Sequence, residues 1–268
     1  MTLIMGVLNV TPDSFSDGGR WASTDAAIEH AIDLQSQGAD LIDVGGESTR
    51  PGAGRVAPLD EQARIIPVIE ELSRRGLMIS VDTLNSSTAE AAAAAGAHII
   101  NDVSGGLADP AMASVAAETG LQFIAMHWRA HAQEMDRMTH YGDVVVDVRN
   151  ELSARVDALL AAGVSAERII LDPGLGFSKV TEHNWEILAR LNEFDELGLP
   201  VMIGASRKRF VASVLPDAAP VLDRDLPTAV ISVLAAQAGA WAVRVHDVAG
   251  TRTALSVLAR VSSARMDS

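Results

Sequence analysis

The feature that most constrains this chain is a regular alternation of short apolar runs with helix-like stretches. Eight runs rich in Ile, Leu, Val and Met occupy residues 3–10, 41–45, 78–82, 98–103, 122–128, 168–174, 201–206 and 241–248. They are nearly continuously hydrophobic rather than alternating, which is typical of parallel strands buried on both faces. The pattern predicts a sheet of eight parallel strands.

Helical patterns lie between these runs. Several open with Ser, Thr or Asp and close on Gly, as helix boundaries do; clear examples are residues 24–38, 87–97, 146–163 and 225–240. Successive strand–helix units predict an α/β fold, a single (β/α)8 TIM barrel spanning residues 1–268 as one domain. The alternative is a doubly wound open sheet, which uses fewer strands and a G-x-G-x-x-G first turn that the sequence lacks.

Polar or glycine-rich residues follow the end of nearly every predicted strand. In a barrel all these ends open on one face, where barrel enzymes hold their sites. The stability of a barrel rarely requires charged side chains at nearly every strand end. The sequence therefore places an active site at the C-terminal ends of the strands.

Two carboxylates and a carboxamide, Asp82, Asn101 and Asp172, end the third, fourth and sixth strands. They suit a flat heterocycle with amidine-like N–H donors and a ring carbonyl, because such a ring is recognised bidentately. Asp and Asn also cap loops, so each residue alone has a structural alternative. Three of them at one mouth favour a binding pocket.

A second group of polar residues falls at the first, second and eighth strand ends: Asn9, Thr49, Arg50, Arg244 and His246. Arginine forks, a hydroxyl and the glycine-rich backbone of GESTRPGAG suit a phosphate or diphosphate. An Asn oxygen beside a diphosphate is a candidate ligand for Mg²⁺, which prefers oxygen. The alternatives are a surface ion pair for either arginine and a core or cap role for the histidine.

The segment SRKRF, residues 206–210, is expected to begin the helix after the seventh strand. A helix N-terminus with nearby cations binds carboxylates and phosphates. Lys208 is expected to reach inward. The three consecutive cations cannot all face one way, so at least one of Arg207 and Arg209 is expected in solvent.

Eight segments together resemble the dihydropteroate synthases: MGVLNVTPDSFSDGG, DVGGESTRPGA, SVDT, NDVSGG, MHWR, LDPGLGF.K, GASRKRF and RVHDV. They run from residue 5 to residue 248 in the family's order, and the likeness is to bacterial, single-function forms. The resemblance implies a (β/α)8 barrel that joins dihydropterin-methyl diphosphate to 4-aminobenzoate, giving 7,8-dihydropteroate and diphosphate. It also implies a target of sulfonamides and a homodimer formed through residues 226–238 and 249–262.

The resemblance also implies roles for individual residues. The pterin pocket would contain Asp82, Asn101, Asp172 and Lys208. The diphosphate site would contain Asn9 with Mg²⁺, Thr49, Arg50, Arg244 and His246. The 4-aminobenzoate site would contain Pro51, Phe177, Ser206, Arg207 and Phe15. The catalytic residues would be Asp13, Thr49, Arg50 and Lys208, with Asp13 and Phe15 on a mobile first loop.

The chemistry agrees with this assignment. Diphosphate is a good leaving group once arginine and metal neutralise its charge. Its departure leaves a pterin methylene cation, which Asp13 or Asp82 would stabilise before the neutral amine attacks. The sequence departs from the family at Ser178, where Gly or Ala is more usual, and residues 128–143 have no assigned role.

Two rival functions use the same pocket. A pterin-binding methyltransferase barrel shares the acidic and Asn strand ends but has no use for Thr49, Arg50, Arg244 and His246. A catalytically silent paralogue would bind pterin without turnover, and intact Asn9, Arg50, Lys208 and His246 argue against it.

Composition narrows the partners. A net charge of −14 and the lack of a long basic run argue against nucleic-acid binding. No apolar run approaches membrane-spanning length, and the first residues lack a signal-peptide pattern, so neither a membrane nor export is expected. The chain has no cysteines, which fits a cytoplasmic protein.

Overall fold

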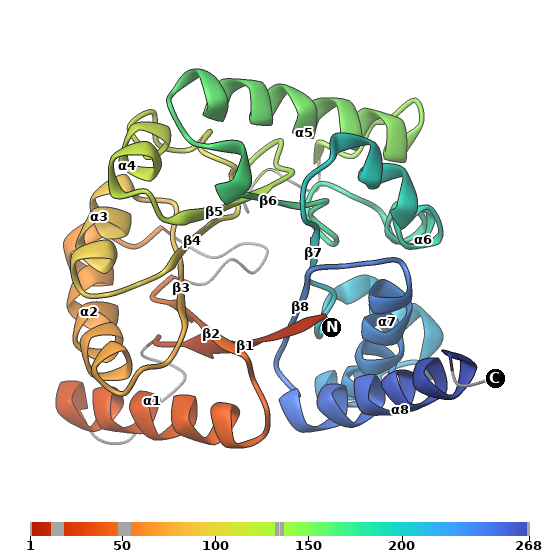
Figure 1. Ribbon diagram of the computed structural model, residues 1–268, viewed down its shortest axis with the longest axis horizontal. Coiled ribbons are helices and arrows are strands. Elements are labelled where there is room, and N and C mark those ends of the chain that lie inside the picture. The colour runs from red at the N-terminus through yellow and green to blue at the C-terminus, as the bar shows by residue number, and fades with distance from the viewer. Residues whose placement is uncertain (1, 12–18, 48–54, 132–133, 135–136, 267–268) are drawn as a thin grey trace.

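The computed structural model describes residues 2–11, 19–47, 55–131, 134 and 137–266. Its strands form one parallel sheet in the order β6-β5-β4-β3-β2-β1-β8-β7. A parallel bridge between Leu171 and Val201 joins the two ends of this order and closes the barrel (Figure 1). The strands are β1 Leu3–Asn9, β2 Leu41–Gly45, β3 Ile79–Asp82, β4 Ile99–Asp102, β5 Gln122–Met126, β6 Ile169–Asp172, β7 Met202–Ile203 and β8 Ala242–Val245.

Helices form a ring outside the barrel (Figure 1). The α-helices are α1 Gly19–Ser36, α2 Pro58–Arg74, α3 Ser86–Ala94, α4 Met112–Thr119, α5 Val144–Ala161, α6 Thr181–Ala189, α7 Asp225–Gln237 and α8 Val248–Met266. Short 3₁₀ helices are η3 Ala166–Arg168, η4 Leu191–Leu197, η5 Arg209–Val214 and η6 Val221–Arg224. The predicted (β/α)8 barrel is confirmed.

The core has two parts because each strand buries both faces. Outward strand residues pack against the helices; α2, for example, buries Ile65, Val68, Ile69 and Leu72, spaced as one helical face. Inside the barrel lies a separate apolar layer with one residue from each of seven strands: Met5, Leu41, Ile99, Ile124, Ile170, Met202 and Ala242. This inner layer fills the barrel and leaves no pore.

The seventh unit departs from the prediction. The strand expected over 201–206 is only two residues long, and the helix expected to begin at 206–210 is the 3₁₀ helix η5. Arg207 has a left-handed backbone (φ 58°), which interrupts regular structure at the expected helix start. Pro216 disfavours a helical conformation for Leu215, so a longer helix cannot form before α7.

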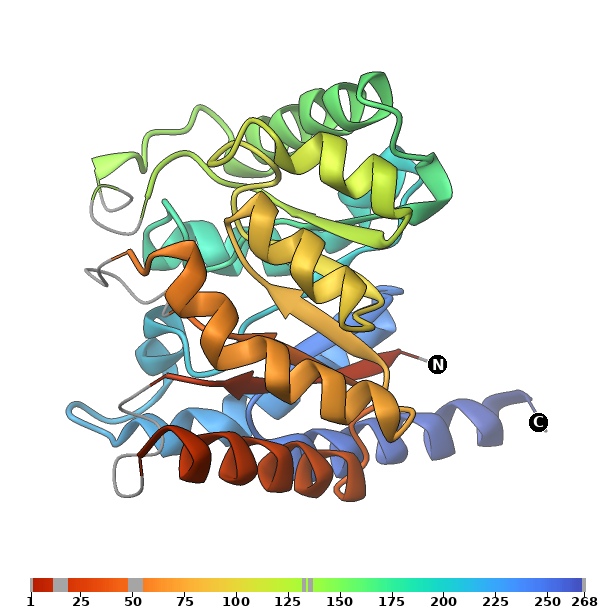
Figure 2. The same cartoon turned by 90° about the vertical axis from the view of Figure 1, so that its left-hand side faces the viewer.

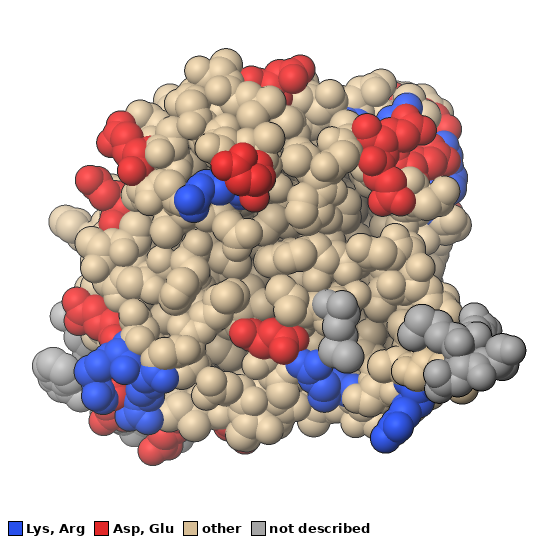
Figure 3. Space-filling view, in the orientation of Figure 1, with Lys and Arg blue, Asp and Glu red and all other residues tan. Residues whose placement is uncertain are grey.

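The two ends of the barrel differ in polarity. In Figure 2 the strands run away from the side that carries the N label. Figure 3 shows the face at which the strands begin, and its middle is mostly covered by uncharged residues. Among the described helices, none is both long and apolar enough to cross a bilayer.

Candidate active site

A polar layer lies directly above the inner apolar layer. Strand side chains alternate between faces, so the residue two positions further along points the same way. Leu41 is followed by Asp43, Ile99 by Asn101, Ile170 by Asp172 and Ala242 by Arg244. These four strands therefore change from apolar to polar within two residues, and the polar side chains meet at the C-terminal mouth.

Arg244 is the centre of one half of this layer. Its Nε donates to Asp43 Oδ2 over 2.6 Å, and its Nη2 donates to Asp82 Oδ2 over 2.8 Å. Asn101 Nδ2 donates to the same oxygen of Asp43 over 3.1 Å. Asp43 is fully buried, and its other carboxylate oxygen has no hydrogen-bond partner among the described residues. Four strands are thus tied together through one guanidinium and one buried carboxylate.

Burial dominates the electrostatics of this group. It raises the pKa of Asp82 to about 7, although the charge of Arg244 opposes the rise. Burial would lower the pKa of Arg244, but the carboxylates of Asp43 and Asp82 outweigh it and raise that pKa above its usual value. The site therefore holds a permanent cation beside an acid that titrates near neutrality.

Asp172 and Lys208 form the other half. Asp172 Oδ1 accepts a hydrogen bond of 2.7 Å from Gly174 N, while Lys208 Nζ donates to the carbonyl of Leu175. The Lys208 ammonium also lies 4.7 Å from the ring centroid of Phe177. Burial lowers the pKa of Lys208 to about 8, with the charge of Asp172 opposing the fall.

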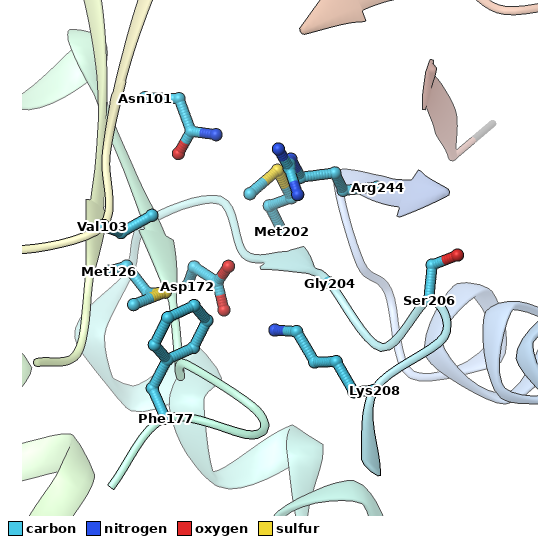
Figure 4. A pocket seen from close by; sticks show the side chains of 10 residues that line it. All are labelled: Asn101, Val103, Met126, Asp172, Phe177, Met202, Gly204, Ser206, Lys208 and Arg244. Atoms are coloured by element: carbon cyan, nitrogen blue, oxygen red, sulfur yellow. The ribbon is translucent and has the colours of Figure 1, made fainter. Parts of the chain in front are cut away.

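A pocket of about 420 Å³ lies between the two halves (Figure 4). In Figure 4 the side chain of Lys208 points toward those of Asp172 and Phe177 from the opposite side, and Asn101 lies above Asp172 in this view. A Cβ added to Gly204 would lie 3.7 Å from both Asp172 Oδ2 and Lys208 Nζ, so this glycine keeps the floor open. Ten residues line the pocket: Asn101, Val103, Met126, Asp172, Phe177, Met202, Gly204, Ser206, Lys208 and Arg244.

Ser206 and His246 lie at the edge of the pocket. Ser206 Oγ is 2.9 Å from His246 Nδ1 and accepts a hydrogen bond of 3.1 Å from the His246 backbone N–H. Asn9 ends β1, in register with Gly45 of β2. Among the predicted diphosphate residues, Asn9, Arg244 and His246 therefore stand at adjacent strand ends, since β8 pairs with β1.

Several predicted residues need separate mention. Asp13, Phe15, Thr49, Arg50 and Pro51 lie outside the described residues. Arg207, predicted for the 4-aminobenzoate site, forms a two-pronged ion pair with Asp225 at 2.8 Å and does not line the pocket. Its role at that site stays a prediction.

The sequence did not single out Asp43. The acid in the middle of the apolar run LIDVG could have indicated a buried ion pair. A strand buried on both faces tolerates a charged side chain only when another group pairs with it. The apolar lining from Val103, Met126 and Met202 was also missed. Such residues carry no sequence signal that distinguishes a pocket wall from the core.

The comparisons with known proteins show the family. A family model described as "Pterin binding enzyme" matches residues 5–246. A dihydropteroate synthase of Mycobacterium leprae is 49% identical over 260 residues, which cover 95% of this chain and 92% of that protein. The structure of Xanthomonas albilineans dihydropteroate synthase with 4-aminobenzoic acid has a TM-score of 0.90 at 43% identity, over 97% of this chain and 93% of that one. Yersinia pestis dihydropteroate synthase in a sulfonamide drug complex has a TM-score of 0.91 at 40% identity, over 98% and 94%. This chain therefore belongs to the pterin-binding enzymes, among the dihydropteroate synthases.

Proposed function

We propose that this chain condenses (7,8-dihydropterin-6-yl)methyl diphosphate with 4-aminobenzoate to give 7,8-dihydropteroate and diphosphate. The observation that carries the proposal is one pocket lined by Asn101, Asp172 and Lys208, with Asp82 bonded to the lining residue Arg244. Carboxylates and a carboxamide offer acceptors for the N–H groups of a pterin, and the ammonium offers a donor for its ring carbonyl. Met126 and Met202 supply apolar surface for the flat ring.

The diphosphate would lie toward the strand ends that carry Asn9, Arg244 and His246, with Thr49 and Arg50 added from outside the described residues. Arginine neutralises phosphate charge and binds it bidentately. Of these residues, Arg244 is already held in place by two carboxylates. An oriented cation of this kind stabilises charge that develops on the leaving group.

Magnesium would sit at the Asn9 end of this site. Among the described residues, no cluster of three or more His, Asp or Glu side chains is arranged to hold a metal. A single side-chain oxygen, from Asn9, fits Mg²⁺, because this ion is commonly held by one or two protein oxygens together with substrate phosphates and water. When bound, the ion would neutralise diphosphate charge; Asn9 would hold it.

Carbon–oxygen cleavage sends the bonding electron pair to diphosphate and leaves a pterin methylene cation. The carboxylates of Asp82 and Asp13 would stabilise that cation electrostatically. The lone pair of the neutral aromatic amine then forms the carbon–nitrogen bond, and the displaced proton passes to water. Phe177, Ser206, Arg207, Pro51 and Phe15 would cradle the amine substrate. Sulfonamides would compete for the same cradle.

We also propose that two copies associate through α7 and α8, which pack side by side (Figure 1). On α7, Leu226, Val230 and Leu234 are exposed at four-residue spacing, and Leu226 is 75% exposed. Val257 and Val261 on α8 repeat the same spacing. This apolar surface supports a homodimer. Sedimentation of Val230→Asp should then show monomers where the native chain shows dimers.

The reaction would take place in the cytoplasm. A chain without cysteines forms no disulfides and so needs no oxidising compartment.

The decisive experiment follows diphosphate release from purified protein given dihydropterin diphosphate, Mg²⁺ and 4-aminobenzoate. Release should require the amine and yield dihydropteroate in equal amount. Asp172→Asn should weaken pterin binding by about tenfold or more, since it removes one charged acceptor of a buried pair of hydrogen bonds. Arg50→Ala should abolish most turnover.

Two results would favour the rival functions. Pterin binding without diphosphate release, at any amine concentration, indicates a catalytically silent paralogue. Transfer of a methyl group with no use of diphosphate indicates a methyltransferase barrel.

A further inference from the structure

The whole chain contains two lysines, Lys179 and Lys208. Lys208 belongs to the proposed pterin pocket, whereas Lys179 has no role in the proposed function. Both amino groups bind carbonyl oxygens of one turn, residues 174–178, which links β6 to α6 and carries Phe177. Lys208 approaches that turn from the pocket, and Lys179 follows it directly in the chain.

The turn has a costly backbone conformation. Gly174 and Gly176 have φ values of 69° and 77°, and Ser178 has a φ of 50°. A left-handed conformation at a non-glycine residue is unfavourable, so such a turn persists only when surrounding contacts hold it. Those contacts determine where Phe177 stands relative to Lys208.

Lys179 supplies two of these contacts. It is 8% exposed, and its Nζ lies 3.0 Å from Gly174 O, 3.1 Å from Phe177 O and 2.9 Å from His127 Nδ1. A lysine ammonium has three donors and no acceptor. Three acceptors around one nitrogen therefore match the protonated form, with His127 accepting at Nδ1.

A network of further residues orients His127 and contacts the turn itself. His127 Nε2 lies 2.9 Å from Glu151 Oε2, and Glu151 also binds the guanidinium of Arg129. Arg129 stacks on the ring of Tyr141, 3.8 Å from its centroid, and Tyr141 OH donates to Ser178 O over 2.9 Å. The network therefore reaches the turn twice, at Phe177 O through Lys179 and at Ser178 O through Tyr141.

We propose that Lys179, oriented by His127 and Glu151, is a positioning residue that fixes the turn bearing Phe177 and so sets the affinity for the amine substrate. The inference rests on the proposed function for its substrate. The pterin pocket is held mainly by Asp82, Asn101 and Asp172, which lie on strands. Loss of the lysine therefore acts on the amine site far more than on the pterin site.

The test compares Lys179→Met with the native chain. Methionine keeps the unbranched stem and removes the three donors, so Phe177 O loses its bond from Lys179 and Gly174 O keeps only its bond from Phe177 N. The KM for 4-aminobenzoate should rise about tenfold or more, which is the loss expected for hydrogen bonds to a charged group. The Kd for 6-hydroxymethyl-7,8-dihydropterin, measured by calorimetry, should change less than about threefold.

A second variant covers the case in which Lys179→Met does not fold. Glu151→Gln keeps Lys179 and the shape of the site but removes the charge that orients His127 and Arg129. It should raise the KM for the amine in the same direction by a smaller factor. Arg149→Met is the matched control, because Arg149 lies on the same helix and pairs with Glu196 rather than with the turn.

A readout without turnover separates the inference from the proposed function. With labelled lysine, the methionine variant gives one lysine side-chain NMR signal, from Lys208. The ring current of Phe177 shifts that signal in the native chain, and the variant should move it toward the position seen in Phe177→Leu. Native turnover tests the proposed function independently.

Two outcomes would overturn the inference. One is an unchanged amine KM together with an unchanged Lys208 signal in a folded variant. The other is an equal loss of amine and pterin affinity, because that result indicates a general structural role rather than positioning of Phe177.

Discussion

Asp43 and Arg244 stand 201 residues apart in the chain, yet the carboxylate of one accepts a 2.6 Å hydrogen bond from the guanidinium of the other. The contact crosses from β2 to β8 inside the barrel mouth. Asp43 has no exposed surface, and the same oxygen also accepts from Asn101. A charge buried this completely is tolerated because its partner is charged and fixed. The pair therefore orients both Arg244 and Asn101 toward the pocket.

We predict that Asp43→Asn weakens both the fold and the site. The substitution keeps the shape but leaves Arg244 with one carboxylate in place of two. Breaking a buried pair costs about 3 kcal/mol in the free energy of unfolding, and pterin affinity should fall at least about tenfold, measured by denaturation and calorimetry. Asp40→Asn is the control, because Asp40 pairs with Arg252 at the surface. Equal effects of the two substitutions would contradict the prediction.

Gly204→Ala should fold normally and bind pterin poorly. The added methyl would lie 3.7 Å from Asp172 Oδ2 and from Lys208 Nζ, which is ordinary contact, but it would occupy the pocket floor. We expect a loss of about tenfold in pterin affinity with little change in thermal stability. Gly142→Ala is a control of similar spacing, because its added methyl would lie 3.8 Å from Asp147 Oδ2 at the surface. Native affinity in Gly204→Ala would show that the ligand does not use this floor.

Ser178→Gly should stabilise the chain. Ser178 has a left-handed backbone (φ 50°), and its buried hydroxyl oxygen has no hydrogen-bond partner among the described residues. Relief of about 1–2 kcal/mol of backbone strain exceeds the entropy cost of glycine, about 0.5–1 kcal/mol. Urea denaturation should therefore show a gain of about 1 kcal/mol. Ser178→Ala, which keeps the strain, should gain less, and a net loss in the glycine variant would refute the strain argument.

The pH dependence of pterin binding should be bell-shaped. Asp82 accepts N–H groups only when ionised, and its pKa is raised to about 7, so affinity should rise as pH increases through that value. Lys208 donates best as the ammonium, and its pKa is lowered to about 8, so affinity should fall above it. Calorimetry from well below the pKa of Asp82 to well above that of Lys208 measures both sides of the bell. Because the chain has two lysines, NMR of labelled lysine follows Lys208 directly. Its titration near the usual value of 10.5 would contradict the alkaline limb.

The sequence predicted the barrel well because its signal is local. Each strand is an apolar run, and Asp82, Asn101 and Asp172 stand at the ends of such runs, so the fold and the pocket floor follow from the same pattern. The register of β3 with β4 places Asp82 beside Asn101.

Other features depend on partners that no local pattern reveals. Asp43 lies inside a run, and its partner is at the far end of the chain. Arg207 and its ion-pair partner Asp225 are 18 positions apart, and the path of the chain between them, through η5 and η6, is not specified by any local pattern. The short β7 likewise reflects where the chain must leave the sheet to form the pocket, at Gly204.

The inner apolar layer has a kinetic consequence. Because Met5, Leu41 and Ile170 and their neighbours fill the barrel below the polar layer, the pocket is closed toward that end. The proposed pterin residues Asp82, Asn101 and Asp172 lie at its bottom, while Phe177 is half-buried nearer the rim. An amine that arrived first would stand in the path of the pterin. We therefore predict an order of arrival, pterin before amine, with the joined product leaving toward the same mouth.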